Sequence, residues 1–320
     1  MNPSDFAKLL SQLESLSTKQ LARIRETLKG LPHTSGAAIA GVLQGPNVCP
    51  NCQAPAEQLR PWGHSHGLPR MRCQACGKTC NALTGTPLAH LRKREQWLGY
   101  AQALIEGVSV RQAAQCCSVD KNTAFLWRHR FLQAAATHRP AHEGGIVEAD
   151  ETFFLESFKG QRKLPRCARK RAGVGAAWEH IAVLVVRDRS GQTADFRLQK
   201  IDASHITDVL GPLVDKDAIL CTDGARVYQK VARNMGLTHR AINVHKGIHV
   251  IEGAFHIQNV NAYDSRLKQW MKRFHGVATK YLENYLGWRR MLERYRQSIS
   301  PAICLSEAMG RFQLQQLIQT

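Results

Sequence analysis

The sequence has few acidic residues and no long apolar run. Lys and Arg total 44 against 25 Asp and Glu, which gives a formal net charge of +19. A charge this large favours a polyanionic partner, with nucleic acid first and an anionic membrane surface second. No stretch approaches the roughly 20 uninterrupted apolar residues of a membrane-spanning helix. The composition therefore predicts a nucleic-acid partner and no membrane.

The sequence also lacks an internal repeat, a low-complexity tract and a recognisable export signal. Residues 1–10 carry Asp5 and have no basic segment before an apolar core, as a secretory signal would. Ten cysteines are present, and four of them form two CxxC pairs, which suits a reducing compartment and one metal site better than disulfides. The 320 residues suffice for two or three domains with a sizeable core. We therefore expect a cytoplasmic, multidomain protein.

Two aspartates lie where aspartate is unfavourable. Asp150 lies in the apolar run 146–154, and Asp223 lies near the end of the run 218–224. Both runs have the pattern of buried strands, where an ionised carboxylate costs several kcal/mol unless a cation pairs with it. For one such residue alone, a turn cap or an arginine partner is the ordinary explanation. Two in so basic a chain suggest divalent metal ions and phosphate chemistry.

Two CxxC pairs, separated by 20 residues, predict a structural zinc site. Four thiolates in two such turns complete a closed tetrahedral site, which suits Zn²⁺ and leaves no position open for catalysis. His64, His66 and Cys80 are spare candidates, and the two histidines are expected in an exposed loop. The pairs are Cys49, Cys52, Cys73 and Cys76.

Residues 106–131 have the pattern of a helix, a short turn and a second helix. Ser109 can cap the first helix, and Asp120 or Asn122 can cap the second. Phe125 is expected to be partly buried. Polar and basic side chains on the second helix suit a helix-turn-helix in a major groove, although many helical hairpins touch no DNA. The candidate DNA contacts here are Lys121, Asn122, Thr123 and Arg128.

From residue 146 strands alternate with helices, which predicts an α/β domain. Amphipathic helices are expected before it at 4–30, and a linker at 136–145. A second basic segment, 159–173, holds seven Lys or Arg and no acid, and we interpret it as a clamp on the DNA backbone. Its candidate contacts are Arg162, Lys163, Arg169, Lys170 and Arg171. The expected strands are 146–154, 180–187, 193–201, 217–222 and 239–245, and the expected helices are 204–214, 224–236 and about 258–274.

Three segments make the chain recognisable: VEADETFF around Asp150, CTDGARVY around Asp223, and HIQNVNAYDSRLKQWMKRFHGVATKYLENYLGWRR from residue 256. Together they resemble bacterial insertion-sequence transposases of the DDE type, in the group with an N-terminal zinc ribbon. The resemblance covers roughly 46–292. It implies a ribonuclease-H-like catalytic domain, a mixed sheet flanked by helices, in which Asp150 and Asp223 bind two Mg²⁺ ions, with Mn²⁺ as a substitute. One Zn²⁺ would hold the ribbon.

The third position of the family is often Glu, with Lys seven residues later. The resemblance places Asn261 and Lys268 there, which makes an Asp-Asp-Asn-Lys variant. An Asn carbonyl can bind Mg²⁺ but adds no charge, and Lys268, two turns on along the same helix face, could hold a phosphate. His256 and then Glu252 remain rival ligands. Asp264 stands where the group leads us to expect His, and it adds a negative charge one turn from Asn261.

Two further acids flank Asp150. Strand alternation puts Glu148 on the same face as Asp150 and Glu151 on the opposite face. A structural or surface role is expected for both.

The resemblance implies a transposase that binds terminal inverted repeats, cleaves the element ends and joins them to target DNA. Its partners would be double-stranded DNA and further copies of itself, in the bacterial cytoplasm and at the nucleoid. The alternatives are a catalytically inactive, transposase-derived DNA-binding regulator and, less favoured, a general metal nuclease. The expected organisation is a helical segment at 1–45, a zinc ribbon at 46–84, a helix-turn-helix at 88–135, the catalytic domain at 146–295 and a tail at 296–320.

Overall fold

The computed structural model describes residues 45–164, 179–243 and 246–312, together with a few positions before 45. The chain divides into two compact units, Met1–Gln44 and Gly45–Thr320. In the first unit helical residues occur between 8 and 23, and most of the helix predicted over 4–30 lies outside the described residues.

A small antiparallel sheet carries the cysteine pairs. A 3₁₀ turn η1 (Ala56–Gln58) leads into β1 (Leu59–Ser65), which pairs with β2 (Leu68–Cys73), and β2 pairs with β3 (Thr79–Cys80). Leu59 lies opposite Cys73 and packs with it in a small buried cluster. Because this cluster holds few apolar side chains, the sheet needs a further source of stability.

Helices follow where the sequence predicts them. They are η2 (Arg94–Gln96), α4 (Trp97–Ile105), α5 (Val110–Cys116) and α6 (Lys121–Thr137). Ser109 and Gln112 form a reciprocal capping box at the start of α5. Asp120 Oδ1 accepts from the Asn122 amide at 2.7 Å and starts α6. The predicted pair of helices joined by a short turn is therefore present.

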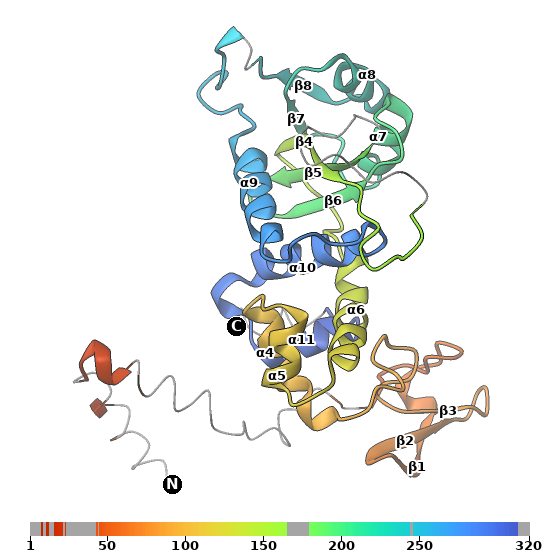
Figure 1. Ribbon diagram of the computed structural model, residues 1–320. Helices are drawn as coiled ribbons and strands as arrows, with labels where there is room; N and C mark the ends of the chain where they lie inside the picture. Colours follow the sequence, from red (N-terminus) through yellow and green to blue (C-terminus); the bar gives the residue numbers. More distant parts are fainter. Residues whose placement is uncertain are drawn as a thin grey trace. The chain divides into compact units, whose positions relative to one another are not determined.

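Two helices from the end of the chain pack onto this group. The first, α10 (Leu282–Tyr295), follows η5 (Thr279–Tyr281) and packs against α6. The second, α11 (Pro301–Ala308), follows η6 (Arg296–Ser298) and packs against α4 and α6 (Figure 1). At Gly287 an added Cβ would lie 2.3 Å from the Ala135 carbonyl oxygen, so only glycine allows α10 this close. The predicted tail at 296–320 thus contains a packed helix, and 313–320 lie outside the described residues.

A five-stranded mixed sheet forms the centre of the α/β region. Its strands are β4 (Ile146–Leu155), β5 (His180–Asp188), β6 (Thr193–Arg197), β7 (Ile219–Thr222) and β8 (Thr238–Ala241). Their order is β6-β5-β4-β7-β8; β4, β5 and β6 are antiparallel neighbours, and β7 and β8 run parallel to β4. The strand predictions hold, although β6 and β8 each end four residues earlier than expected.

Helices cover both faces of this sheet. On one face α7 (Ala203–Leu210) and α8 (Arg226–Met235) pack on a core that includes Val147 and Ala149 of β4. On the other, α9 (Gln258–Lys272) packs against β4 and β5, and α10 reaches β6 (Figure 1). The predicted mixed sheet flanked by helices is confirmed, and alternate residues of β4 serve opposite layers.

The segment predicted as a linker, 136–145, packs against the sheet. The Glu143 amide donates to the Leu213 carbonyl at 2.8 Å, and Arg139 Nε donates to the Asp195 carbonyl at 2.8 Å. The Glu143 side chain is fully buried. The sequence signals of a linker, Pro140 and two glycines, mark a tight connection and not a flexible one.

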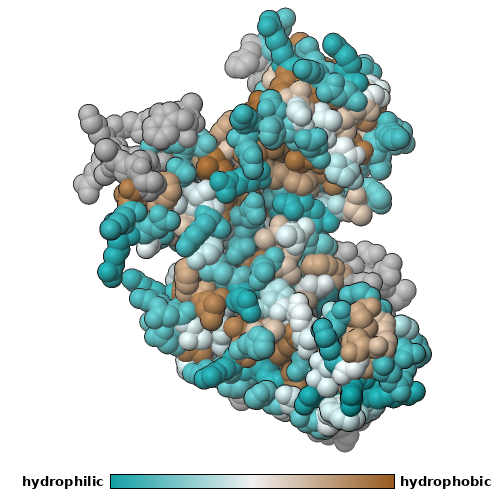
Figure 2. Space-filling view, turned by 90° about the vertical axis from the view of Figure 1, so that its right-hand side faces the viewer, coloured by the Kyte–Doolittle hydropathy of each residue, from teal (hydrophilic) through white to brown (hydrophobic). Residues whose placement is uncertain are grey.

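Arg290 joins the helices to the sheet. This fully enclosed side chain forms an ion pair with Asp195 of β6 and donates to the carbonyls of Ala135 and Ala136 at 3.0 Å each. It therefore satisfies the free carbonyls at the end of α6. The face of the molecule shown in Figure 2 is mainly hydrophilic, with scattered apolar residues. No helix in the described ranges is long and apolar enough to cross a membrane.

Candidate functional site

The four paired cysteines converge on one point. Their Sγ atoms all lie within 4.8 Å of one another, with Cys49–Cys76 and Cys52–Cys73 each at 3.7 Å. These distances are too long for a disulfide bond of about 2.05 Å. A tetrahedron of Zn–S bonds of about 2.3 Å has edges of about 3.8 Å. The donor set and its spacing therefore fit one zinc ion.

The spare candidates stand outside this set. His64 and His66 are exposed, as predicted, although His64 lies in β1 and not in a loop. Cys80 is buried beside the cluster in β3, but its sulfur is not one of the four converging ligand atoms. The four-cysteine cluster thus fits the zinc-ribbon prediction.

Asp150 and Asp223 lie at the same level of two neighbouring strands. The parallel register pairs Ile146 with Ile219 and Glu148 with Cys221, a constant offset of 73. Asp150 and Asp223 have the same offset, so they face each other just beyond the last paired residues. Asp223 follows β7 directly, and its Oδ1 accepts from the Ala225 amide at 2.9 Å. The two acids therefore share one edge of the sheet.

The electrostatics agree with this placement. Burial raises the pKa of Asp150, the Glu151 amide bound to its Oδ1 at 2.9 Å opposes the rise, and the Asp223 carboxylate raises it further. Lys268 lowers the pKa of Asp150, so its ammonium acts at the same place. Both acids and the predicted phosphate-binding lysine thus belong to one electrostatic group.

Glu148, for which the sequence predicts a structural or surface role, is a fully buried carboxylate. Its Oε2 accepts from the amides of Asn259 and Val260 at 2.8 and 2.9 Å, the second and third residues of α9. Its Oε1 accepts from Asn259 Nδ2 at 3.0 Å. A negative charge at this position satisfies free amides at the positive end of the helix. Glu148 therefore fixes the start of α9 against β4, two residues from Asp150.

The two rival ligands are engaged elsewhere. His256 Nδ1 lies 3.4 Å from Glu148 Oε1, and Arg189 forms an ion pair with the same carboxylate. Glu252 is exposed and pairs with Arg240 at 3.6 Å. His256 thus supports the cap on α9, and Glu252 belongs to a surface pair.

Three residues along α9 differ in exposure. Asn261 and Lys268 are exposed, whereas Asp264 belongs to the buried face of the helix. The pKa of Asp264 is raised to about 7, first by burial and then by the Asp150 carboxylate, while Lys268 lowers it. The Asp150 carboxylate therefore influences the ionisation of Asp264.

Within the described ranges only the four cysteines bring three or more ligand atoms within 4.8 Å of one another, so the acids are spaced more widely.

Glu151 lies on the opposite side of β4, as strand alternation predicts. Its pKa is raised to about 7 by burial; a contact with the Tyr228 hydroxyl of α8 opposes this rise, and Asp150 and Asp223 add to it. Asp150 and Glu148 therefore lie on the face of β4 that is turned to α9.

The candidate DNA contacts on α6 divide into two groups. Lys121 and Asn122 are exposed at its start, and Thr123 is half-buried. Arg128 is fully buried: its Nη2 donates to the Val108 carbonyl at 2.8 Å, and its guanidinium lies 4.7 Å from the Trp288 ring centre. The prediction that Arg128 faces outward is wrong because α10, distant in sequence, covers that side of α6.

One aromatic residue of α6 also differs from expectation. Phe125, predicted to be partly buried, is 43% exposed. Leu126 beside it is 51% exposed. The start of α6 therefore presents apolar as well as polar side chains.

The basic segment 159–173 is only partly described. Arg162 and Lys163 are exposed, and the candidates Arg169, Lys170 and Arg171 lie outside the described residues. Lys159 has a defined task, since its Nζ donates to three successive carbonyls, 274–276, at the end of α9, at 3.0, 3.1 and 2.8 Å.

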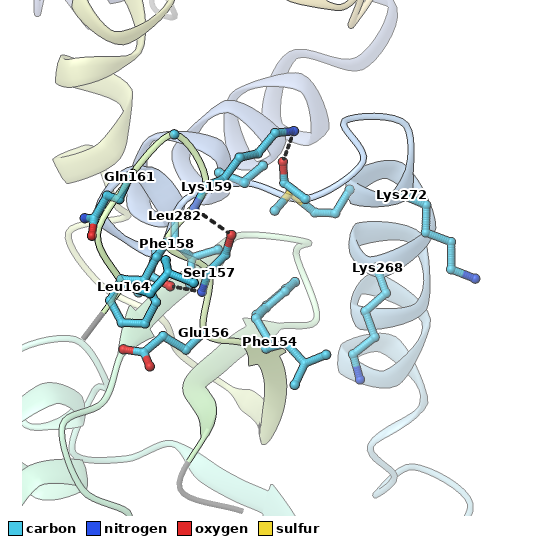
Figure 3. Close-up of a pocket in the computed structure, with 16 residues that line it drawn as sticks. Phe154, Glu156, Ser157, Phe158, Lys159, Gln161, Leu164, Lys268, Lys272 and Leu282 are labelled. Carbon is cyan, nitrogen blue, oxygen red and sulfur yellow. Dashed lines mark hydrogen bonds between the residues drawn. The ribbon is translucent and has the colours of Figure 1, made fainter. Parts of the chain in front are cut away.

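Beside this contact lies a cavity of about 710 Å³, between the segment 154–164 and α9. Figure 3 shows Phe154 between the end of β4 and α9, with Lys268 and Lys272 on the helix side. The basic segment thus adjoins the lysine that acts on Asp150.

Residues 143–289 match the family of ISXO2-like transposase domains. No curated protein matches the chain. The solved structures that resemble it include a simian T-cell lymphotropic virus intasome in complex with the PP2A regulatory subunit B56 gamma (11% identity, 59% of this chain and 66% of that one, TM-score 0.28). They also include the pre-cleavage Mos1 transpososome (12%, 65% and 78%, TM-score 0.20) and the Mos1 paired-end complex with the left transposon end (13%, 70% and 82%, TM-score 0.21).

At these TM-scores the structural likenesses carry no argument, and the chain aligns with less than two thirds of the first one. The family match is independent of them. It spans β4, β7 and α9, and with them Asp150, Asp223, Asp264 and Lys268. The resemblance found in the sequence is thereby confirmed: residues 143–289 form a DDE-type insertion-sequence transposase domain of the ISXO2-like family.

Proposed function

We propose that this protein binds the terminal inverted repeats of an insertion sequence, hydrolyses a phosphodiester bond at each end, and transfers the freed 3′-hydroxyls to target DNA. The observation that supports this most directly is the shared level of Asp150 and Asp223 on adjacent parallel strands within a transposase domain. Three antiparallel strands followed by two parallel ones, with helices on both faces, support the ribonuclease-H-like expectation.

Asp150 and Asp223 are the proposed ligands of two Mg²⁺ ions, with Mn²⁺ as a substitute and Asn261 as a third ligand. Carboxylate oxygens are the donors that these cations prefer. The pKa of Asp150 is raised by burial and by Asp223 despite the opposing effect of Lys268, which fits a site whose negative charge exceeds its positive charge. The bound ions would activate the attacking water or 3′-hydroxyl and stabilise the leaving oxygen. Lys268 would hold a phosphate of the DNA end.

The remaining modules would bring DNA to this edge. The exposed start of α6, with Lys121, Asn122 and Thr123, is the proposed reader of the transposon end. Arg162 and Lys163 would contact the phosphate backbone. One Zn²⁺ in the four-cysteine cluster would hold the ribbon, and we expect the protein to act as a homo-oligomer on double-stranded DNA.

Mg²⁺-dependent cleavage of a labelled inverted-repeat end tests the proposal. Asp150→Ala or Asp223→Ala should abolish cleavage and strand transfer, because each removes a ligand, while a mobility-shift assay should show end binding largely unchanged. Asp217→Ala, which removes an exposed acid just before β7, is the matched control and should cleave normally. Strand transfer by either active-site variant in Mg²⁺ would refute the assignment.

The same assay separates a second candidate function. Asn261 adds no negative charge at the family's third position, which favours a transposase-derived DNA-binding regulator without catalysis. Such a protein would bind the ends specifically and cleave none of them in Mg²⁺ or Mn²⁺. Cleavage by the wild-type protein excludes this function.

A further inference from the structure

Asp264 is a buried acid on the face of α9 that packs against the sheet. The buried residues of this helix are otherwise apolar or aromatic, and Asp264 is 7% exposed among them. Within the described part of the chain its Oδ1 has no hydrogen-bond partner. An ionised carboxylate in this position is costly unless something compensates its charge. Its burial therefore needs an explanation that its protein neighbours do not supply.

The surroundings of Asp264 point toward Asp150. α9 packs against β4, the strand that carries Asp150 (Figure 1), and the Asp150 carboxylate acts on Asp264. Lys268 acts on both acids, one turn further along the helix. Two acids that act on each other, with one lysine acting on both, leave a deficit of positive charge that a divalent cation would fill.

Among the described residues, the other acids near this place are engaged elsewhere. Asp195, which also acts on Asp264, forms an ion pair with the buried Arg290. Glu148, on the same face of β4, is fully used in capping α9. Glu151 faces Tyr228 on the opposite side of the sheet, and Glu252 pairs with Arg240 at the surface. Asn261, the family's third position, is exposed and neutral.

We propose that Asp264, one helical turn beyond Asn261, supplies the third carboxylate of the metal site that Asp150 and Asp223 begin. This inference rests on the proposed function and changes its ligand set. Asn261 contributes no charge, so two aspartates alone would give the site two negative charges, and Asp264 raises this to three. Ligand charge and number set divalent-cation affinity, so the third carboxylate should matter to binding itself.

Mn²⁺ binding to the full-length, zinc-loaded protein tests this by isothermal titration calorimetry at pH 8. Asp264→Asn keeps the shape and removes the charge, and it should weaken Mn²⁺ binding by about tenfold or more, comparable to Asp150→Asn, for the loss of one carboxylate ligand. Circular dichroism should show each variant folded, because an amide replaces an acid that the fold does not pair.

Two matched controls separate ligation from general electrostatics and from burial. Glu151→Gln removes a charge that acts on the same two aspartates from the other face of β4. Glu143→Gln changes another fully buried acid, seven residues along the chain from Asp150. Both should bind Mn²⁺ within about threefold of the wild type, since neither removes a ligand.

Two results would overturn the inference: Asp264→Asn binding Mn²⁺ like the wild type, or Glu151→Gln weakening it as much as Asp264→Asn does. Failure of the proposed function would look different. In that case Asp150→Asn itself would bind Mn²⁺ as the wild type does, and no metal site would exist at Asp150.

Discussion

The four-cysteine cluster and the aspartate edge are two candidate metal sites built in opposite ways. The four sulfurs come from 28 consecutive positions, 49–76, and already lie within 4.8 Å of one another. The acids come from β4, the end of β7 and α9, which span more than a hundred residues, and they are more widely spaced. The ligand atoms of the cysteine cluster already converge in the folded chain, whereas the acids come from three elements that are distant in sequence.

This difference follows from what each site has to do. A closed thiolate site adds folding free energy to a sheet with a small core. An open carboxylate site has to admit DNA and metal ions. Its negative charges repel one another when no cation is bound. Loss of a ligand should therefore destabilise the first and leave the second folded. The free energy of unfolding of variants at each site tests this contrast.

The largest effect is expected at the zinc ligands. Cys73→Ser should lose zinc and unfold 46–84, because metal binding contributes on the order of 10 kcal/mol to such folds. Hydrogen exchange should show fast exchange of β1–β3 amides while β4–β8 stay protected, and end binding should weaken. Cys80→Ser, a buried cysteine outside the set, is the control and should retain one zinc per chain. Full zinc content in Cys73→Ser would contradict the assignment.

Loss of Glu148 should cost more stability than loss of either aspartate at the sheet edge. Glu148→Ala leaves Arg189 and His256 without their shared partner and uncaps α9, so we expect about 3–5 kcal/mol of lost stability. Glu148→Gln, which keeps one carbonyl acceptor, should lie between this variant and the wild type. Urea unfolding measures both, with the exposed Glu57→Ala as control. A wild-type midpoint for Glu148→Ala would mean that the cap is dispensable.

Glu143 makes stability depend on pH. Burial and nearby Asp188 raise its pKa to about 9, while Arg187 and a nearby backbone amide oppose this. In the folded state Glu143 keeps a proton that it loses near pH 4.5 in the unfolded state. The stabilising contribution of Glu143 is therefore full below pH 4.5 and disappears as pH rises toward 9. By linkage the decline is on the order of a few kcal/mol.

Thermal unfolding measured across pH tests this. Glu143→Gln should match the wild type near pH 4 and exceed it at pH 8–9, because the amide stays neutral. The exposed Glu57→Ala should follow the wild-type curve. Parallel curves for Glu143→Gln and the wild type would show that Glu143 is ionised in the fold.

Local patterns in the sequence were sufficient for much of this architecture. Spacing alone predicted the four-cysteine cluster, the cap at Ser109 and the strand that carries Asp150, because each depends on neighbouring residues. The equal offset of the two aspartates needed only that their strands be adjacent. Motif resemblance then located the third segment on α9.

The errors came from contacts with distant elements. Arg128 has the polarity of a surface residue, but α10 covers it, and no pattern within α6 reveals this. The partners of Glu148 lie 111 and 112 residues away, so its role could not be inferred from β4. The burial of Asp264 likewise depends on how α9 meets the sheet.

The smallest stability change is expected at the aspartate edge. A large change there would directly contradict the contrast with the cysteine cluster. Asp150→Asn should leave the free energy of unfolding within about 1 kcal/mol of wild type, or raise it slightly, because it removes a charge that burial and Asp223 both disfavour. Urea unfolding in metal-free buffer at pH 8 measures this, with Asp217→Asn as the surface control. Asp150→Asn should nevertheless lose DNA cleavage. If Asp150→Asn instead cost as much stability as Glu148→Ala, Asp150 would be a structural residue. The cysteine cluster and the aspartate edge would then no longer differ in whether their ligands stabilise the fold.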